Sequence, residues 1–213
     1  MKKKSFLKVI ILLFVFFCAG KVLAFDEGAV RDFLNTTGEK LIQTLGLEDK
    51  EARYQILDQM FDENIDVEYM GRYVLGRYYK TLNDEQKARY TALFARYIKS
   101  LYKSYPIDFK TEEIGFEILK AHEMPKHIEA AAVVDIPEKY RTEGLEQVKV
   151  EFRIHQKENI FLIADLKIAD VSMLLTLRQK FMQMMKDADE EPSWFLEDFE
   201  DLTVSNEMSL DLN

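Results

Sequence analysis

The residue types that could bind a metal are few in this sequence, and their spacing does not suit a metal site. His122 and His127 lie five residues apart in "HEMPKH", with Pro125 between them. A zinc-protease helix needs H-E-x-x-H, so that both rings share one helical face, whereas the proline favours a turn. We therefore expect no metal site, with these two histidines solvated at a hairpin turn and His155 on the polar side of a strand.

Motifs for nucleophilic catalysis and phosphate binding are also incomplete. Ser172 lies in "DVSML" rather than in G-x-S-x-G, so a nucleophile elbow is not predicted. Two glycines five residues apart are followed by Arg77 and Tyr78, where a P-loop needs Lys and Ser or Thr. Asp165 interrupts the apolar run "IFLIADLKIA" and is the one carboxylate that stands out as a potential general base. A structural carboxylate or an outward-facing strand residue is the simpler interpretation of Asp165.

The N-terminal segment has the layout of a secretory signal. "MKKK" is basic, residues 10–17 are apolar, and Val22 and Ala24 are small residues at the −3 and −1 positions of a cleavage site. The apolar run is shorter than the ~20 residues needed to span a bilayer, which makes a retained membrane anchor the weaker alternative. We expect cleavage after Ala24 and a mature protein in the bacterial periplasm. Cys18, the only cysteine, would leave with the signal peptide.

Charge is unevenly distributed along the chain. The formal net charge is −9, and the first 24 residues carry five lysines and no acidic residue, so the remainder carries −14. Residues 187–213 contain ten carboxylates and no Lys or Arg. Phosphate backbones are bound by basic surfaces, so we expect no nucleic-acid partner. We expect a single domain over residues 25–202, followed by an acidic flexible tail at 203–213.

Hydrophobic periodicity predicts helices in the first half of this domain. Apolar residues recur at intervals of three and four in four segments, of which the last is the longest and most aromatic. These segments are about 30–45, 51–61, 66–74 and 84–105. Asp66 is placed to cap the third helix, and Thr81 or Asn83 to cap the fourth.

The second half of the domain changes to a period of two. Four alternating segments separated by turn-like stretches predict an antiparallel meander. They lie at about 114–118, 128–136, 148–154 and 160–168. Asp170 or Ser172 then begins a final amphipathic helix. Helices first, a sheet second and a helix last indicate an α+β fold with a four-stranded antiparallel sheet.

Two stretches resemble the MlaC family of periplasmic phospholipid-binding proteins, also called the toluene-tolerance family. "VLGRYYKTLNDEQK" and the aromatic helix after it are similar to that family's "hLGRYW"-like motif, T-x-E-Q-R/K-like helix start and F/Y-rich helix, where h is apolar. "FLIADLKIADVSMLLTLRQKF" resembles the family's W-x-h-x-D-h-x-h-x-G-h-S-h-x-x-x-Y-R-x-x-F pattern. Phe161 and Tyr79 replace frequent tryptophans, Asp170 replaces the usual glycine, and Leu177 replaces a common tyrosine.

The resemblance implies a fold and a function. Helices would wrap a twisted antiparallel sheet and enclose an apolar cavity for the acyl chains of a glycerophospholipid, with the head group near its mouth. The protein would be a monomeric carrier rather than an enzyme, with no cofactor apart from its lipid cargo, and would maintain outer-membrane lipid asymmetry. Its partners would be an outer-membrane lipoprotein–porin complex and an inner-membrane ABC transporter with an MCE-domain subunit, with transient proximity to membranes.

The side chains expected to serve this function fall into three groups. The cavity candidates are Met70, Val74, Tyr78, Phe94, Ile98, Leu101, Tyr102, Val134, Val150, Phe152, Ile154, Leu162, Leu166, Leu174, Leu177 and Phe181. The head-group candidates are Arg72 and Arg77, for which structural ion pairing is the alternative. The motif residues with expected structural roles are Gly71, Gly76, Asp165, Ser172 and Arg178, and the glycines would let chain segments approach closely.

Two other classes of function stay open at this point. One is a small-molecule enzyme on a cone-shaped α+β fold with Asp165 as its base. The other is an adaptor in envelope maintenance whose apolar interior is ordinary core. A carrier of hopanoids or other lipids is a variant of the phospholipid-carrier hypothesis.

Overall fold

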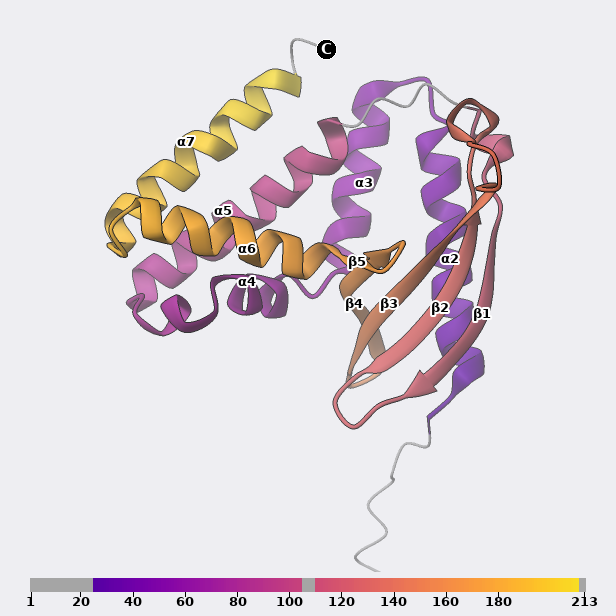
Figure 1. The fold of residues 1–213 in the computed structure, drawn as a ribbon, viewed down its shortest axis with the longest axis horizontal. Helices are drawn as coiled ribbons and strands as arrows, with labels where there is room; N and C mark the ends of the chain where they lie inside the picture. The colour runs from indigo at the N-terminus through magenta and orange to yellow at the C-terminus, as the bar shows by residue number, and fades with distance from the viewer. Residues whose placement is uncertain (1–24, 105–109, 211–213) are drawn as a thin grey trace, which may run out of the picture.

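The computed structural model describes residues 25–104 and 110–210, so the signal peptide expected at 1–24 lies outside the described part of the chain. Most of the helices gather on one side of the molecule, and the sheet with helix α2 lies on the other (Figure 1). No helix within the described ranges is long and apolar enough to cross a membrane.

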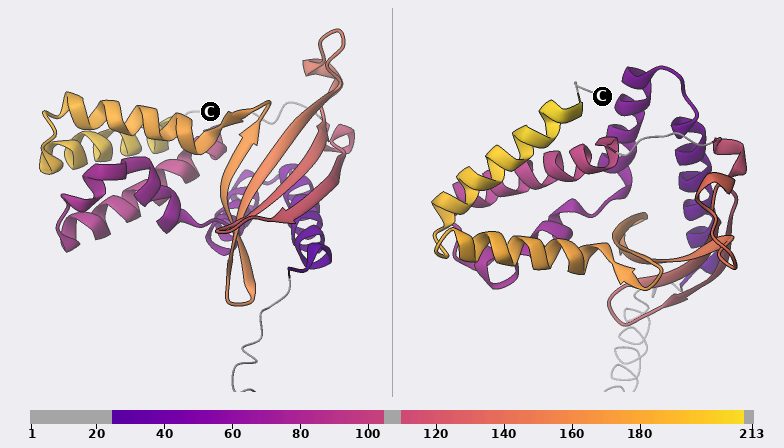
Figure 2. Two further views of the ribbon diagram at one scale, coloured as in Figure 1. Left: turned by 60° about the horizontal axis from the view of Figure 1, so that its bottom comes forward. Right: turned by 45° about the horizontal axis from the view of Figure 1, so that its top comes forward.

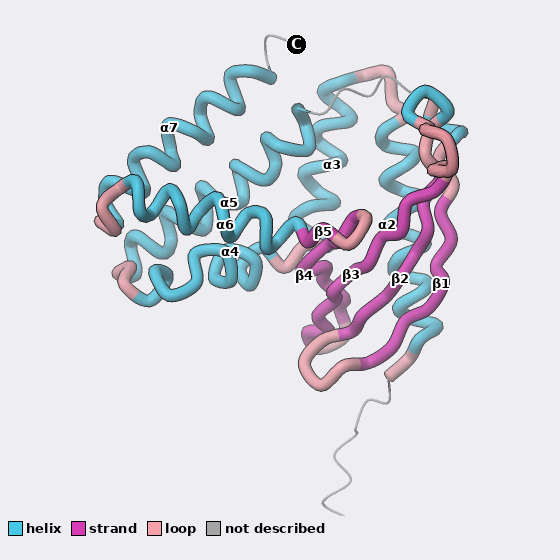
Figure 3. The backbone as a smooth tube through the Cα atoms, viewed as in Figure 1, coloured by secondary structure: helices cyan, strands magenta, loops and turns pink. Residues whose placement is uncertain are grey.

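The first α-helices precede the strands and the last ones follow them, in the order that the hydrophobic periods predict (Figure 3). The α-helices are α2 (Glu27–Leu45), α3 (Lys50–Asn64), α4 (Val67–Leu75), α5 (Asp84–Ser104), α6 (Met173–Asp187) and α7 (Pro192–Leu210). The 3-10 helices are η1 (Gly76–Lys80), η2 (Thr111–Glu113) and η3 (Glu138–Tyr140). The strands are β1 (Phe116–Glu123), β2 (Ile128–Asp135), β3 (Gln147–Lys157), β4 (Ile160–Ile168) and β5 (Val171–Ser172).

The sheet is an antiparallel meander in the order β1-β2-β3-β4-β5, and Figure 2 shows its twist. The predicted α+β class is confirmed, but the predicted number of four strands is one too few. The fifth strand escapes a search for alternation because it has only two residues. It follows a tight turn at Ala169 and Asp170, which both have positive φ. An aspartate tolerates that conformation better than most residues do, so it can stand where the family usually has glycine.

The cross-strand register gives the sheet one apolar face and one charged face. The apolar rows are Phe116 with Val134 and Val148; Ile118 with Ala132, Val150 and Ile168; and Ala121 with Ala130, Phe152 and Leu166. The charged rows include Glu129 with Arg153, and Glu151 with Lys167. Helix α2 packs against the apolar face through Val30 and Leu34, which form a cluster with side chains of β1, β2 and β3.

A second apolar cluster, the helical cluster, lies among α4, α5, α6 and α7. Its centre consists of six aromatic rings whose contacting pairs have centroids 4.8–6.3 Å apart, mostly tilted or edge-to-face. The rings belong to Tyr90, Phe94, Tyr97, Phe181, Phe195 and Phe199, and all are essentially inaccessible to solvent. The helical cluster is therefore a closed core.

Helix α7 corrects the prediction of a loose tail from residue 203. The helix continues to Leu210, and Thr203 is fully buried with its hydroxyl bonded to the Phe199 carbonyl. Acidic residues in this helix are held by α5, since Arg89 pairs with Glu200 and Arg96 pairs with Glu207. Composition suggested solvation, whereas tertiary pairing stabilises the helix. Residues 211–213 lie outside the described part of the chain.

A buried carboxylate connects α6 to the sheet. Asp165 Oδ2 accepts a hydrogen bond from the Ser172 hydroxyl at 2.7 Å, and Oδ1 accepts from the backbone N–H groups of Leu166 and Leu174 at 2.8 and 3.0 Å. Ser172 is the N-cap of α6 and accepts from Leu175 N–H at 3.0 Å. Both oxygens of Asp165 are thus occupied in fixing the start of α6.

A second buried carboxylate connects α4 to β3 and β4. The Asp66 side chain is 1% exposed; it contacts His155 Nδ1 at 2.8 Å and Lys157 Nζ at 2.9 Å, and it caps α4 through Tyr69 N–H. Its backbone N–H donates to the Ile163 carbonyl. Burial raises the pKa of Asp66, but the hydrogen bonds from Lys157, His155 and Tyr69 outweigh burial and leave that pKa lowered.

Because the pKa of Asp66 is lowered in the folded protein, the ionised carboxylate stabilises the fold at pH values above 3.8, the ordinary pKa of the group. This stabilisation is lost as the pH falls below 3.8 and through the lowered pKa. We expect Asp66→Asn to cost about 3 kcal/mol of unfolding free energy near neutral pH, since Lys157 and His155 lose their buried partner. That cost should shrink in acid. Urea melts from about pH 7 down to about pH 2 measure it. A cost that does not vary with pH would contradict the pairing, and Asp62→Asn at an exposed pair is the control.

Removing the other carboxylate tests the attachment of α6. Asp165→Ala leaves the Ser172 hydroxyl and the Leu174 N–H without their acceptor in a buried place. We expect a loss of about 3 kcal/mol in unfolding free energy, at ~1–3 kcal/mol for each unsatisfied group. The exposed Glu117→Ala, on the other end of the sheet, should change stability by less than about 0.5 kcal/mol. Equal midpoints for the two variants would rule out this role of Asp165.

Candidate functional site

The two stretches that resemble the MlaC family meet in space at Gly76. This glycine ends α4 with φ +58° and ψ −124°, and a Cβ built on it would lie 2.6–2.9 Å from guanidinium atoms of Arg178. Arg178 donates a hydrogen bond to the Tyr73 carbonyl, and its guanidinium lies 5.2 Å from the Tyr73 ring centroid. The absence of a Cβ at Gly76 leaves room for the arginine of the second motif.

Gly71 lies inside the helical cluster, where there is room for a Cβ. The Tyr90 hydroxyl donates to the Gly71 carbonyl at 2.9 Å, and a Cβ on Gly71 would touch the rings of Tyr90 and Phe94 at 3.4 and 3.5 Å. Burial raises the pKa of the Tyr90 hydroxyl well above its usual value, so the group stays a neutral donor. The structure therefore requires a glycine at Gly76, whereas at Gly71 it shows only a close packing contact.

The two arginines that directly follow these glycines are engaged in ion pairs. Arg72 lies 3.7 Å from Glu68 on the surface of α4. Arg77 lies 3.2 Å from Glu190 and donates to the Tyr78 hydroxyl at 2.8 Å. These contacts correspond to the structural alternative considered from the sequence, and contact with a lipid head group stays a prediction.

The sixteen cavity candidates fall into two main sets rather than one. Nine belong to the helical cluster or pack against it: Met70, Val74, Tyr78, Phe94, Ile98, Leu101, Leu174, Leu177 and Phe181. Five lie on β2, β3 and β4: Val134, Val150, Phe152, Ile154 and Leu166. Tyr102 donates instead to Asp58 beside Phe61, and Leu162 is paired with His155 on the other side of the sheet.

The apolar face of the sheet is covered only in part. Val30 and Leu34 of α2 are buried over one part of it. Several apolar side chains of the same face keep partial access to solvent, and Ile168 is 40% exposed. The half-buried ones are Phe116, Val134, Val148, Phe152 and Leu166. We call this set, with the buried Val150 and the exposed Ile168, the apolar sheet face; it is separate from the helical cluster.

Three members of the apolar sheet face were not among the sequence candidates. Phe116 and Val148 alternate in phase with residues that were chosen, so the period of two could have found them. Ile168 alternates in phase with Leu166, so the same period could have found it; the bulge between Arg153 and Ile154 instead places Leu162 on the other side of the sheet.

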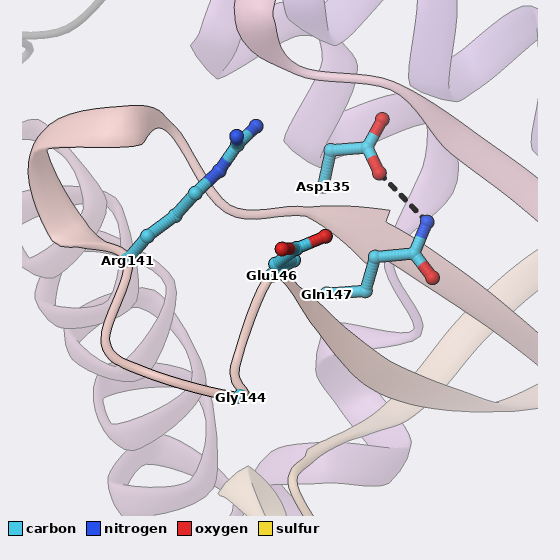
Figure 4. Close-up of a pocket in the computed structure, with 5 residues that line it drawn as sticks. All are labelled: Asp135, Arg141, Gly144, Glu146 and Gln147. Carbon is cyan, nitrogen blue, oxygen red and sulfur yellow. Dashed lines mark hydrogen bonds between the residues drawn. The ribbon is translucent and has the colours of Figure 1, made fainter.

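A cavity of about 380 Å³ lies elsewhere, at the connection between β2 and β3. Figure 4 shows its lining, where Gln147 donates to Asp135 at 2.8 Å; the Nε of Arg141 donates to the Ile136 carbonyl. Gly144 and Glu146 complete it. Acyl chains need apolar walls, so these charged and amide groups do not suit them.

The histidines and acidic residues offer little for catalysis. His122 and His127 flank the β1–β2 turn and contact Glu129 at 3.5 and 3.1 Å. Within residues 25–104 and 110–210, no group of three or more His, Cys, Asp or Glu side chains is placed to hold a metal ion. Asp165 is buried and its oxygens already accept three hydrogen bonds, which disfavours the hypothesis of a general base.

Gly76→Ala tests the junction of the two motifs. The variant strains the backbone at positive φ and forces Arg178 away, so we expect a loss of roughly 1–3 kcal/mol in unfolding free energy, measured by urea denaturation. In the double variant with Arg178→Ala the steric conflict disappears while the backbone strain remains, so the two losses should not add. Strict additivity of the two single losses would show that Gly76 and Arg178 do not interact.

Comparison with known proteins places this geometry in a family. The family model described as MlaC protein matches residues 35–193. A phospholipid-binding protein from Ralstonia solanacearum, solved in complex with a phospholipid, has a TM-score of 0.66 at 12% identity, covering 83% of this chain and 97% of that chain. At that identity the likeness shows the fold alone. No curated protein sequence matches. Because the family model spans both motifs and most of the described residues, the chain belongs to the MlaC family.

Proposed function

We propose that this protein is a soluble phospholipid carrier of the bacterial periplasm. The observation that carries the proposal is the apolar sheet face, which the protein's own helices leave half covered. Membership of the MlaC family and a similar fold solved with a bound phospholipid support the same reading.

The energetics of lipid transfer explain why such a face is useful. A phospholipid with two acyl chains exposes on the order of 30 methylenes in water, at ~0.8 kcal/mol each, or roughly 20 kcal/mol in total. A carrier has to replace the bilayer interior with an equally apolar surface, so that exchange is nearly neutral. The apolar sheet face offers Val, Ile, Leu and Phe side chains for this purpose.

Head-group recognition is expected to be broad. Arg72 and Arg77 are paired with carboxylates, and the apolar rows of the sheet carry no cationic side chain. The bound lipids should therefore reflect the membrane pool. Native mass spectrometry of the purified protein would contradict this if one head-group class dominated over a mixed pool.

The N-terminal signal expected from the sequence and membership of the MlaC family support a proposal for the cellular setting. Export to the periplasm would place the carrier between an outer-membrane lipoprotein–porin complex and an inner-membrane ABC transporter with an MCE-domain subunit. Transfer between them would maintain lipid asymmetry of the outer membrane without covalent chemistry. The occupied hydrogen bonds of Asp165 agree with a binding protein rather than an enzyme.

Two adjacent valines on β2 provide a matched test. Val134 lies on the apolar sheet face, whereas Val133 pairs with Lys149 on the opposite face, and both are half-buried. We expect Val134→Arg to lower bound phospholipid per chain at least about fivefold, because a cation beside acyl chains is costly to desolvate. Val133→Arg should keep its lipid. Native mass spectrometry and solvent extraction give the occupancy, and circular dichroism confirms folding.

The same experiment separates the competing functions. A wild-type chain without phospholipid would point to an adaptor or an enzyme. Equal loss of lipid in both valine variants would place the acyl chains away from the apolar sheet face.

A further inference from the structure

We propose that the outward face of α7 is a docking surface for a partner protein whose own surface is basic. Seven residues spaced by one, three or four lie on this face, which we call the α7 stripe. They are Trp194, Glu197, Asp198, Asp201, Val204, Ser205 and Met208, and all are exposed. The inference concerns a contact between proteins and does not depend on the cargo.

The opposite side of α7 fixes the orientation of the stripe. Phe195 and Phe199 are completely buried in the helical cluster. The ion pairs of Glu200 with Arg89 and of Glu207 with Arg96 hold the flank of α7 to α5, and Figure 2 shows the two helices side by side. The stripe is therefore presented outward by a rigid helix.

The carboxylates of the stripe lack the partners that their neighbours have. Glu197, Asp198 and Asp201 make no ion pair or side-chain hydrogen bond with any described residue, whereas Glu200 and Glu207 are neutralised. Like charges four residues apart on a helix, as at Glu197 and Asp201, destabilise it. A basic partner would remove this repulsion. Carboxylates that are unpaired in the free protein are therefore available for a partner protein.

Apolar side chains at both ends of the stripe indicate that the partner is a protein. Trp194 is 55% exposed and Met208 is 64% exposed, with Val204 between them. Tryptophan and methionine are enriched where proteins meet, and here they flank the three carboxylates on one helix face. The complementary surface has lysines or arginines in its centre and apolar positions at both sides.

Other occupants fit less well. An anionic membrane surface would be repelled by the stripe, and so would nucleic acid. A second copy of this chain brings the same acidic stripe and a net-negative surface. The family match ends at residue 193, just before the stripe begins, so this surface lies beyond the pattern that the family model describes.

The size of the stripe predicts a transient contact. From Trp194 to Met208 the helix rises about 21 Å, which suits an interface at the small end of the specific range. Charge complementarity of this kind raises association rates and weakens with salt. A carrier that must leave its partner after each transfer benefits from such a contact.

Site-specific photo-crosslinking tests the proposal on the full-length protein. A benzophenone amino acid at Val204 is activated in the presence of two probes: detergent-solubilised membrane proteins of the source organism, and protein-free vesicles of phosphatidylethanolamine and phosphatidylglycerol. We expect a protein adduct whose cross-linked peptide is rich in Lys and Arg. Its yield should fall at least about tenfold in the triple variant Glu197→Lys, Asp198→Lys and Asp201→Lys.

A matched triple variant controls for net charge. Asp32→Lys, Glu39→Lys and Glu117→Lys change the same number of exposed carboxylates away from α7 and should keep the adduct. If the reversed stripe does not fold, the neutral triple Glu197→Gln, Asp198→Asn and Asp201→Asn replaces it, again with a lower yield expected.

Four results would overturn the proposal: no protein adduct, an adduct with vesicle lipid alone, a cross-linked peptide without basic residues, or equal yields from the two lysine triples. The phospholipid content of each variant, measured separately, distinguishes this outcome from failure of the carrier function.

Discussion

The protein depends on the tight packing of six aromatic rings among α4–α7, because this closed cluster lets another apolar surface stay open. A chain that needed its sheet face for stability would have to cover it with its own helices. Here Phe94, Phe181 and their neighbours bury large areas in edge-to-face contacts. The apolar sheet face is then only partly covered by α2. In the proposed carrier, stability and lipid binding would thus depend on different parts of one fold.

Two buried carboxylates connect the helical part of the protein to the sheet. Asp66 fixes the start of α4 against β3, and Asp165 fixes the start of α6 against β4 and β5. Each carboxylate is buried and accepts hydrogen bonds from several donors. Hydrogen bonds are directional, so they orient the two parts in a way that apolar contacts do not. Arg178 then ties α6 to the end of α4 across Gly76. The residues that resemble the family motifs therefore serve architecture, and the side chains proposed to bind lipid lie on strands with less recognisable sequence.

The sequence predicted the elements well because their periods are long and clear. Helix α5 and strands β2 and β3 follow directly from spacing. Tertiary pairing was not accessible: Asp66 was identified as a cap, but its partners lie about ninety residues away. The cavity candidates were chosen by apolarity alone, which cannot separate the closed helical cluster from the half-open sheet face. Composition misled at the end of α7, where an acidic tail was expected from residue 203 although the helix continues to Leu210 and Arg96 of α5 holds Glu207.

The aromatic side chains of α7 determine where the chain can be truncated for recombinant expression. Phe195 and Phe199 complete the ring cluster, yet both lie beyond residue 193, where the family match ends. A fragment trimmed to that boundary would leave the faces of Tyr90, Tyr97 and Phe181 bare to water. Such a fragment would be prone to aggregate, so the smallest workable recombinant product extends to the end of α7.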